Sequence, residues 1–288
     1  MFMNKKDRVR QAIDYRSATV RARIRNERNL AGWKRDQRTP LPVGTQLPVI
    51  FCTWHRLGRL PRTLDLLAGQ DVAVQAFIWN NSPDRAAVDA AAGRARVPVT
   101  VHHSPRNVGG FGRFYLAREA AAAGHAVVVF IDDDQDFGPA AIGDLVRHHR
   151  PRSLSGWWAF EFRGAGYGDR APALPGERAS YIGTGGMVAD SAVFRDSRLF
   201  RCPRRFWFVE DLWLCYFAER LAGFELYKSP AQFELAEDGR DQYLSLGRTK
   251  WNFLRYLMRR GWEPVRRDGA PGGLAGTGAG LPGEVGLG

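Results

Sequence analysis

Short apolar segments alternate with helix-like segments between residues 47 and 131, and this alternation limits the possible folds more than any other feature. The apolar segments are 49–52, 73–79, 99–102 and 126–131, and the helix-like segments lie near 60–68, 85–93 and 111–123. Such alternation with short connections is typical of an α/β domain built on a largely parallel sheet. The sequence therefore predicts a single α/β domain, with a mostly parallel central sheet flanked by helices.

Composition separates this domain from the two ends of the chain. Residues 1–46 are expected to form a basic helix, over 5–28, and a Pro/Gly linker. The folded domain is expected over 47–246 and a second basic helix over 247–267. The tail, 268–288, has 9 glycines in 21 residues and is expected to be disordered.

The formal net charge of +12 is concentrated in the flanks. Residues 1–38 hold 12 basic and 4 acidic side chains, and 248–267 hold 7 and 1, whereas 39–247 holds 23 of each. A nucleic-acid-binding module is expected to be basic on its folded recognition surface, so no nucleic-acid partner is expected. The flanks either face an anionic membrane surface or pack an apolar stripe on the domain with their arginines in water.

Cysteine usage and hydropathy bear on the compartment. The three cysteines form no CxxC pair, which favours reduced thiols in a cytosolic protein. No apolar run reaches the roughly 18–20 residues of a membrane span, and the N-terminus lacks the apolar core of a secretory signal. A cytoplasmic protein is expected, either soluble or peripheral on the inner face of the cell membrane.

Three carboxylates, Asp132, Asp133 and Asp134, directly follow the apolar segment 126–131. In an extended segment Asp132 and Asp134 would point to one side and Asp133 to the other. Two adjacent carboxylates raise each other's pKa unless a cation lies between them, and Mg²⁺ or Mn²⁺ prefers oxygen ligands. A metal site is therefore predicted, the alternative being a solvated acidic turn.

Two further segments carry candidate chemistry. Arg106 to Arg113 is glycine-rich and precedes a predicted helix, so its backbone and arginines could hold phosphate or an acidic substrate, or it is only a turn. Glu210 and Asp211 open another predicted helix. They act either as an N-cap or as a general base that accepts a hydroxyl proton.

Taken together, these segments resemble the inverting nucleotide-sugar glycosyltransferases of the GT-A fold, specifically the large family 2. The resemblance covers residues 47–228. Five motifs carry it in order: Cys-Thr-Trp-His-Arg at 52–56, Trp-Asn-Asn-Ser at 79–82, Asn-Val-Gly-Gly at 107–110, the Asp triplet at 132–134 and Glu-Asp at 210–211.

The resemblance implies a nucleotide-binding half over 47–137 and an acceptor or catalytic half over 138–246. It implies that Mn²⁺ or Mg²⁺ binds Asp132 and Asp134, and that Asp211, with Glu210 beside it, deprotonates the acceptor. The residues implied at the nucleotide sugar are Thr53, Arg56, Asn80, Ser82, Asn107, Gly109, Gly110, Arg113, Asp132, Asp133, Gly185 and Gly186. The candidate sugar platforms, unless they are core residues, are Trp157, Trp158 and Trp207.

Two departures from the family pattern affect specificity. Trp79 stands where the family has an Asp that contacts the base, so UDP-, GDP- and dTDP-sugars all stay open. No His follows His149 to match the family's downstream metal ligand, and Glu237 or Asp238 is the hypothetical replacement.

The expected function is metal-dependent transfer of a sugar to a hydroxyl of a glycan or lipid-linked acceptor in bacterial cell-surface polysaccharide, glycolipid or cell-wall synthesis. Galactofuranosyl and rhamnosyl transfer are included. Two alternatives remain. A nucleotidyltransferase usually has a glycine-rich loop with basic residues directly after the first strand, and residues 52–56 contain no glycine. A non-catalytic polyanion-binding protein would leave the carboxylates at 132–134 and 210–211 without a role.

Overall fold

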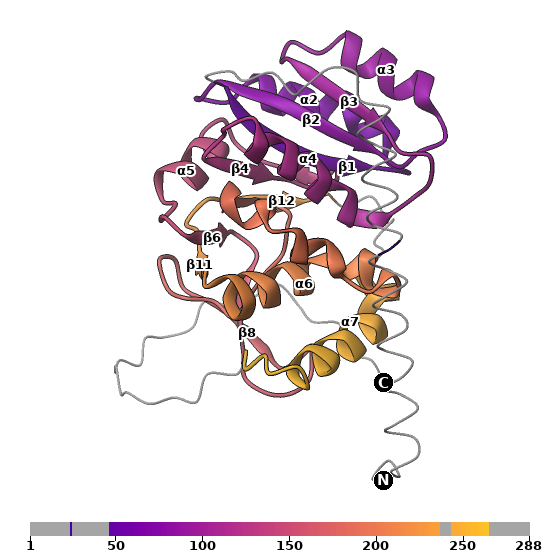
Figure 1. The fold of residues 1–288 in the computed structure, drawn as a ribbon. Coiled ribbons are helices and arrows are strands. Elements are labelled where there is room, and N and C mark those ends of the chain that lie inside the picture. Colours follow the sequence, from indigo (N-terminus) through magenta and orange to yellow (C-terminus); the bar gives the residue numbers. More distant parts are fainter. Residues whose placement is uncertain (1–23, 25–45, 237–242, 265–288) are drawn as a thin grey trace, which may run out of the picture.

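The computed structural model describes residues 24, 46–236 and 243–264 of the chain (Figure 1). The predicted N-terminal helix and linker and the Gly-rich tail lie outside these residues, except for Ile24. Seven strands form the central sheet, in the order β11-β6-β10-β4-β1-β2-β3. They are β1 (Leu47–Thr53), β2 (Val74–Asn80), β3 (Val99–His103), β4 (Val127–Phe130), β6 (Ser153–Gly156), β10 (Met187–Asp190) and β11 (Glu225–Lys228).

The sheet is mostly parallel. Strand β1 pairs in parallel with β2 and β4, β2 with β3, and β6 with β11, whereas β10 runs antiparallel to both β4 and β6. The predicted fold class, an α/β domain with a mostly parallel central sheet, is confirmed.

Helices cover both faces of the sheet. The longer ones are α2 (Leu60–Ala68), α3 (Arg85–Gly93), α4 (Gly112–Ala122), α5 (Ala141–Arg147), α6 (Glu210–Tyr216) and α7 (Tyr243–Met258). The short turns are η1 (Leu57–Arg59), η2 (Gly109–Phe111), η3 (Ser191–Arg195), η4 (Ser197–Arg201), η5 (Arg204–Val209) and the π-helical η6 (Phe217–Ala222). Two small sheets join β7 (Ala159–Phe162), β8 (Arg170–Pro172) and β9 (Tyr181–Ile182), and β5 (Gln135–Asp136) with β12 (Glu234–Leu235).

Alternate residues of the central strands supply two separate cores. Ile50 and Phe77 face a core that includes side chains of α4, α6 and α7, while Val49, Phe51 and Ile78 face a core with α2, α3 and α5. Strands buried on both faces read as continuous apolar runs, as the sequence has them. A slip of one residue would exchange the two faces, so the register, and with it the position of each strand end, is strongly specified.

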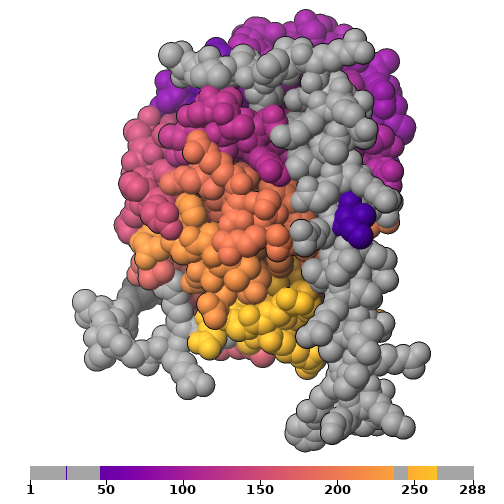
Figure 2. Space-filling view, viewed as in Figure 1, coloured from indigo at the N-terminus to yellow at the C-terminus, as the bar shows by residue number. Residues whose placement is uncertain are grey.

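Helix α7 packs against the domain along one face. Phe253, Leu254 and Leu257 are fully buried, and the ring of Phe253 stacks on Phe206 of η5 at 3.9 Å between centroids. In Figure 2 the yellow surface of α7 adjoins the orange surface of the preceding segments. Among the described residues, no helix combines the length and the apolar character needed to cross a bilayer.

Candidate active site

A cavity of about 960 Å³ opens at the carboxyl ends of β1 and β4, where ligands of open α/β sheets bind. We call it the site cavity. Residues far apart in the sequence meet there. The predicted site residues that line it are Thr53, Arg56, Asn107, Gly109, Gly110, Arg113, Asp132, Asp133, Asp134, Trp157, Trp158, Gly185, Glu210 and Asp211.

Four predicted residues are not among the lining residues. Asn80 and Ser82 build the turn after β2, in which the amide N–H of Ser82 donates to Asn80 Oδ1 at 2.8 Å. Trp207 is a core residue, stacked on Phe111 and donating from Nε1 to the carbonyl of Cys202 at 3.1 Å. Gly186 has a φ of 67°, and a Cβ there would lie 2.2 Å from Trp157 Cδ1.

Asn81, which the sequence analysis did not select, joins the β2 turn to the glycine-rich segment. Its Nδ2 donates to the carbonyl of Gly109 at 3.1 Å, and its Oδ1 accepts from the amide N–H of Val108 at 3.1 Å. Gly109 has a φ of 66°, a conformation that L side chains rarely adopt. At Gly110 a Cβ would lie 1.8 Å from Glu210 Oε1, so the absent side chain leaves room for that carboxylate.

Trp79 lies behind this segment rather than in the cavity. It is buried, and its Nε1 donates to Asn81 Oδ1 at 3.2 Å. A Cβ on Gly112 would lie 2.3 Å from the indole, so the first residue of α4 packs directly on the ring. Trp79 therefore packs against the glycine-rich turn and is not among the residues that line the site cavity.

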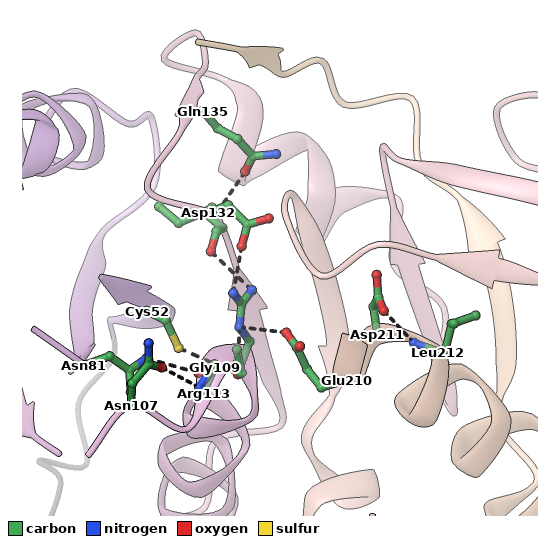
Figure 3. Close-up of polar contacts among 12 residues, drawn as sticks. Cys52, Asn81, Asn107, Gly109, Arg113, Asp132, Gln135, Glu210, Asp211 and Leu212 are labelled. Carbon is green, nitrogen blue, oxygen red and sulfur yellow. Dashed lines mark hydrogen bonds and ion pairs between the residues drawn. The ribbon is translucent and has the colours of Figure 1, made fainter. Parts of the chain in front are cut away.

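Arg113 of α4 is the central cation of the site (Figure 3). Its Nη2 donates to Asp132 Oδ1 at 2.7 Å, and its Nε lies 3.8 Å from Glu210 Oε1 and donates to the carbonyl of Gly110 at 3.2 Å. The guanidinium is almost fully buried. One buried charge therefore connects the Asp triplet, the glycine-rich turn and the start of α6.

The Asp triplet crowds negative charge against Arg56, whose Nη1 lies 3.3 Å from Asp134 Oδ2 and 3.8 Å from Asp133 Oδ1. Burial raises the pKa of Asp133 to about 6, although Arg56 opposes the shift. Burial, together with the charge of Asp132, raises the pKa of Asp134 to about 7. A cation beside them would relieve this repulsion.

One expectation for the triplet is wrong. Asp133 does not point away from its neighbours, and all three carboxylates line the site cavity. The reason is that β4 ends at Phe130 and residues 133–134 form a turn, so strand alternation does not apply. No group of three or more potential His, Cys, Asp or Glu metal ligands is assembled within the part of the chain that the structure describes, and Glu237 and Asp238 lie outside that part.

Glu210 and Asp211 form the first turn of α6, where the N-cap is Val209, so the interpretation of either as an N-cap is wrong. Burial raises the pKa of Glu210 to about 7, against the opposing charge of Arg113. Asp211 Oδ1 accepts from the amide N–H of Leu212 at 2.8 Å, and Oδ2 accepts from the hydroxyl of Tyr181.

Sequence reasoning missed Tyr181 of β9 and Lys250 of α7, both of which line the site cavity. Lys250 Nζ lies 3.6 Å from Asp211 Oδ2. One signal was available for the lysine: it shares the helical spacing of the apolar positions 253, 254 and 257, which predicts a buried side chain. The tyrosine carried no comparable signal.

The fold and the cavity define the class of protein: an α/β domain with an acidic cavity at the carboxyl ends of neighbouring parallel strands. No protein-family model matches the chain, and no curated protein matches it.

Solved structures with a similar fold include those of S. aureus TarS. One TarS structure is 16% identical to this chain, with a TM-score of 0.44, and the match covers 70% of this chain and 38% of the TarS chain. TarS 1–349 is 16% identical, with a TM-score of 0.45, over 67% of this chain and 60% of that one. The same fragment in complex with UDP is 17% identical, with a TM-score of 0.42, over 64% and 57%. The chain thus spans 38–60% of the length of these proteins.

Proposed function

We propose that this protein is an inverting, metal-dependent glycosyltransferase of the GT-A type that moves a sugar from a nucleotide sugar to a hydroxyl acceptor. The observation that carries the proposal is the meeting of two carboxylate groups in one cavity: the Asp triplet after β4, and Asp211 at the start of α6. The first suits a cation with a diphosphate, and the second suits proton removal from a hydroxyl.

The residues around the triplet fit a divalent cation because their oxygens are hard ligands. Burial is the main cause of the raised pKa values of Asp133 and Asp134, and the charge of the neighbouring Asp132 raises both further. Asp132 and Asp134 would hold Mn²⁺ or Mg²⁺, which when bound neutralises charge on the departing diphosphate. Arg56 and the backbone of Gly109 and Gly110 line the same cavity and would bind the nucleotide part.

In the proposed reaction Asp211 accepts the proton of the acceptor hydroxyl. The acceptor oxygen then forms a bond to the anomeric carbon, while the bond between that carbon and the diphosphate oxygen breaks on the opposite face. The configuration at the anomeric carbon is therefore inverted. Glu210 keeps Arg113 in place beside Asp132. Trp157 and Trp158 give the cavity an aromatic wall on which a sugar ring of the acceptor can stack.

Nucleotide-sugar binding is the main test of this function. A panel of UDP-, GDP- and dTDP-sugars, with and without Mn²⁺, should show one donor that raises the melting temperature in the presence of the cation. At a ligand concentration of 100 times Kd the gain is about 2.7 kcal/mol. No stabilisation by any of them would overturn the proposal. Release of a nucleoside diphosphate, as opposed to pyrophosphate, would exclude a nucleotidyltransferase.

The cation effect should depend on pH. Because the pKa values of Asp133 and Asp134 are raised to about 6 and 7, protons compete with the cation below neutrality. Stabilisation by Mn²⁺ should be large at pH 8 and mostly lost at pH 5.5, as measured by thermal denaturation. Asp134→Asn should remove the cation effect at both pH values. An effect that is equal at the two pH values would place the cation elsewhere.

The acceptor is proposed to be a glycan or lipid-linked molecule of the bacterial cell surface, with galactofuranosyl and rhamnosyl donors included, on the strength of the sequence motifs. A peripheral location at the inner membrane face is proposed from α7. Its outer side exposes Arg248, Trp251, Arg255 and Arg259 at helical spacing, with the Arg255 guanidinium 4.4 Å from the centroid of the Trp251 ring. Arginine with exposed tryptophan suits an anionic lipid interface.

Removing two of these charges should weaken membrane binding. Arg248→Ala with Arg255→Ala should lower co-sedimentation with phosphatidylglycerol vesicles by at least tenfold, at about 1 kcal/mol for each basic residue near the surface. The matched control is Arg85→Ala with Arg94→Ala, which removes two exposed arginines at α3, the opposite end of the domain (Figure 1). Equal binding by both double variants would contradict this location.

A further inference from the structure

A buried lysine lies against the proposed base. Lys250 of α7 is only 7% exposed, and its Nζ lies 3.6 Å from Asp211 Oδ2. The same ammonium donates to the hydroxyl of Tyr167 at 3.2 Å and lies 5.2 Å from the centroid of that ring. Burying an ammonium group is costly unless it is paired and hydrogen-bonded. Lys250 meets this requirement, because its ammonium group is paired with Asp211 and hydrogen-bonded to Tyr167. These contacts hold the ammonium group in one position.

The groups that face Asp211 come from four segments. Tyr181 of β9 donates its hydroxyl to Oδ2, and that hydroxyl in turn accepts from Tyr167, in the loop between β7 and β8, at 3.1 Å. Glu210 and Cys215 share helix α6 with Asp211, and Lys250 comes from α7. Among the ion pairs of the described residues, Lys250 provides the cation of Asp211, whereas Arg113 is directed to Asp132 and Glu210.

These contacts determine the orientation of the Asp211 carboxylate. Burial raises the pKa of Tyr181, and the charge of Asp211 raises it further, so its hydroxyl stays protonated and donates. The Leu212 amide holds Oδ1 while Tyr181 and Lys250 hold Oδ2. Oδ1, which has a single donor, keeps a lone pair for the acceptor proton.

We infer that α7 completes the active site, with Lys250 as a positioning residue that lies against the Asp211 carboxylate and keeps it aimed at the acceptor hydroxyl. The inference rests on the proposed function and adds to it a residue outside the motifs that carried the family resemblance. Lys250 exchanges no proton in the reaction. The proton passes from the acceptor hydroxyl to Asp211, and the ammonium acts through its charge and through its contact with Tyr167.

The test is Lys250→Met, which keeps the length of the side chain and removes the charge. An opposite charge within 4–6 Å favours the ionised form of a carboxylate by about 1–3 pH units. The acidic limb of the kcat–pH profile should therefore move up by about one unit or more. Loss of the contact that orients Asp211 should also lower kcat at pH 7, by about tenfold. The Kd for the nucleotide sugar, measured by calorimetry, should stay within twofold. Lys250→Arg should restore the acidic limb.

The matched control is Arg260→Met, which removes an exposed cation just beyond the end of α7 and should leave the pH profile unchanged. An acidic limb at the wild-type pH in folded Lys250→Met overturns the inference. If that variant does not fold, Tyr167→Phe decides, because it removes the hydroxyl that holds the ammonium and should move the acidic limb in the same direction. An unmoved limb in Tyr167→Phe then overturns the inference.

Asp211→Asn separates the two levels of the proposal. Wild-type turnover in Asp211→Asn would show that Asp211 is not the base and would overturn the proposed mechanism. A second outcome is possible: Asp211→Asn loses turnover, but Lys250→Met keeps the acidic limb of its pH profile at the wild-type pH. That outcome would support the proposed mechanism and overturn only the role of Lys250.

Discussion

Asp211→Asn is expected to lower kcat by about 10²- to 10⁴-fold, the range that general-base catalysis supplies. The amide keeps the size of the carboxylate and can still accept from the Leu212 N–H, but it cannot take up the acceptor proton. The Kd for the nucleotide sugar should change little, because the proposed donor-binding residues lie on other segments of the site cavity. Single-turnover kinetics and calorimetry measure the two quantities separately.

Asp196→Asn is the matched control for this substitution. Asp196 caps η4 through the Arg198 amide and forms an ion pair with the Arg198 side chain, and it is not among the residues that line the site cavity. Its amide variant should turn over at the wild-type rate. If the Asp211 variant does so too, the proton is removed by another group.

Arg113→Met is expected to cost about 3–5 kcal/mol of unfolding free energy at pH 8.5, because it removes one partner of a buried ion pair. It leaves Asp132 and Glu210 without the cation that both now share. Urea denaturation of the protein without ligands measures the loss. Arg163→Met, which breaks an exposed ion pair with Glu161, should cost less than about 1 kcal/mol.

The loss from Arg113→Met should shrink as the pH falls. The pKa of Glu210 is raised to about 7 by burial even though Arg113 lowers it, so without Arg113 it rises further. The folded variant then takes up a proton at Glu210 more readily than the wild type, and a neutral carboxyl needs no cation. The cost is therefore fully present above pH 8 and smaller at pH 6. A cost that is equal at both pH values would show that Glu210 does not sense Arg113.

The sequence was a good guide to the elements that lie at strand ends. Thr53 is the last residue of β1 and Asp132 lies just after β4. Because these two strands pair in parallel, the meeting of the two residues follows from topology alone. The glycine-rich turn before α4 was also predictable, because a left-handed backbone conformation favours glycine. Gly109 adopts that conformation in the structure. These predictions depend on local spacing and on one rule of sheet geometry.

Other parts of the site depend on contacts that spacing does not reveal. After β2 the sequence favoured Asn80 and Ser82, yet these two bond to each other in the turn, and it is Asn81 that lines the cavity. Lys250 is 39 positions from Asp211 in the chain, and the apolar stripe of α7 shows that the helix packs but not against which element. Only the assembled core determines that choice.

The antiparallel strand β10 holds one wall of the cavity by pairing with a strand on each side. Met187 pairs with Phe130 on one side and with Gly156 on the other, so the backbone of Gly185 and Gly186 is clamped between the exits of β4 and β6. Shifting this wall to admit a bulkier sugar would require breaking sheet pairs on both sides at once. In the proposed glycosyltransferase this wall would limit the size of the donor sugar, and the aromatic side chains that line the cavity would contact the acceptor.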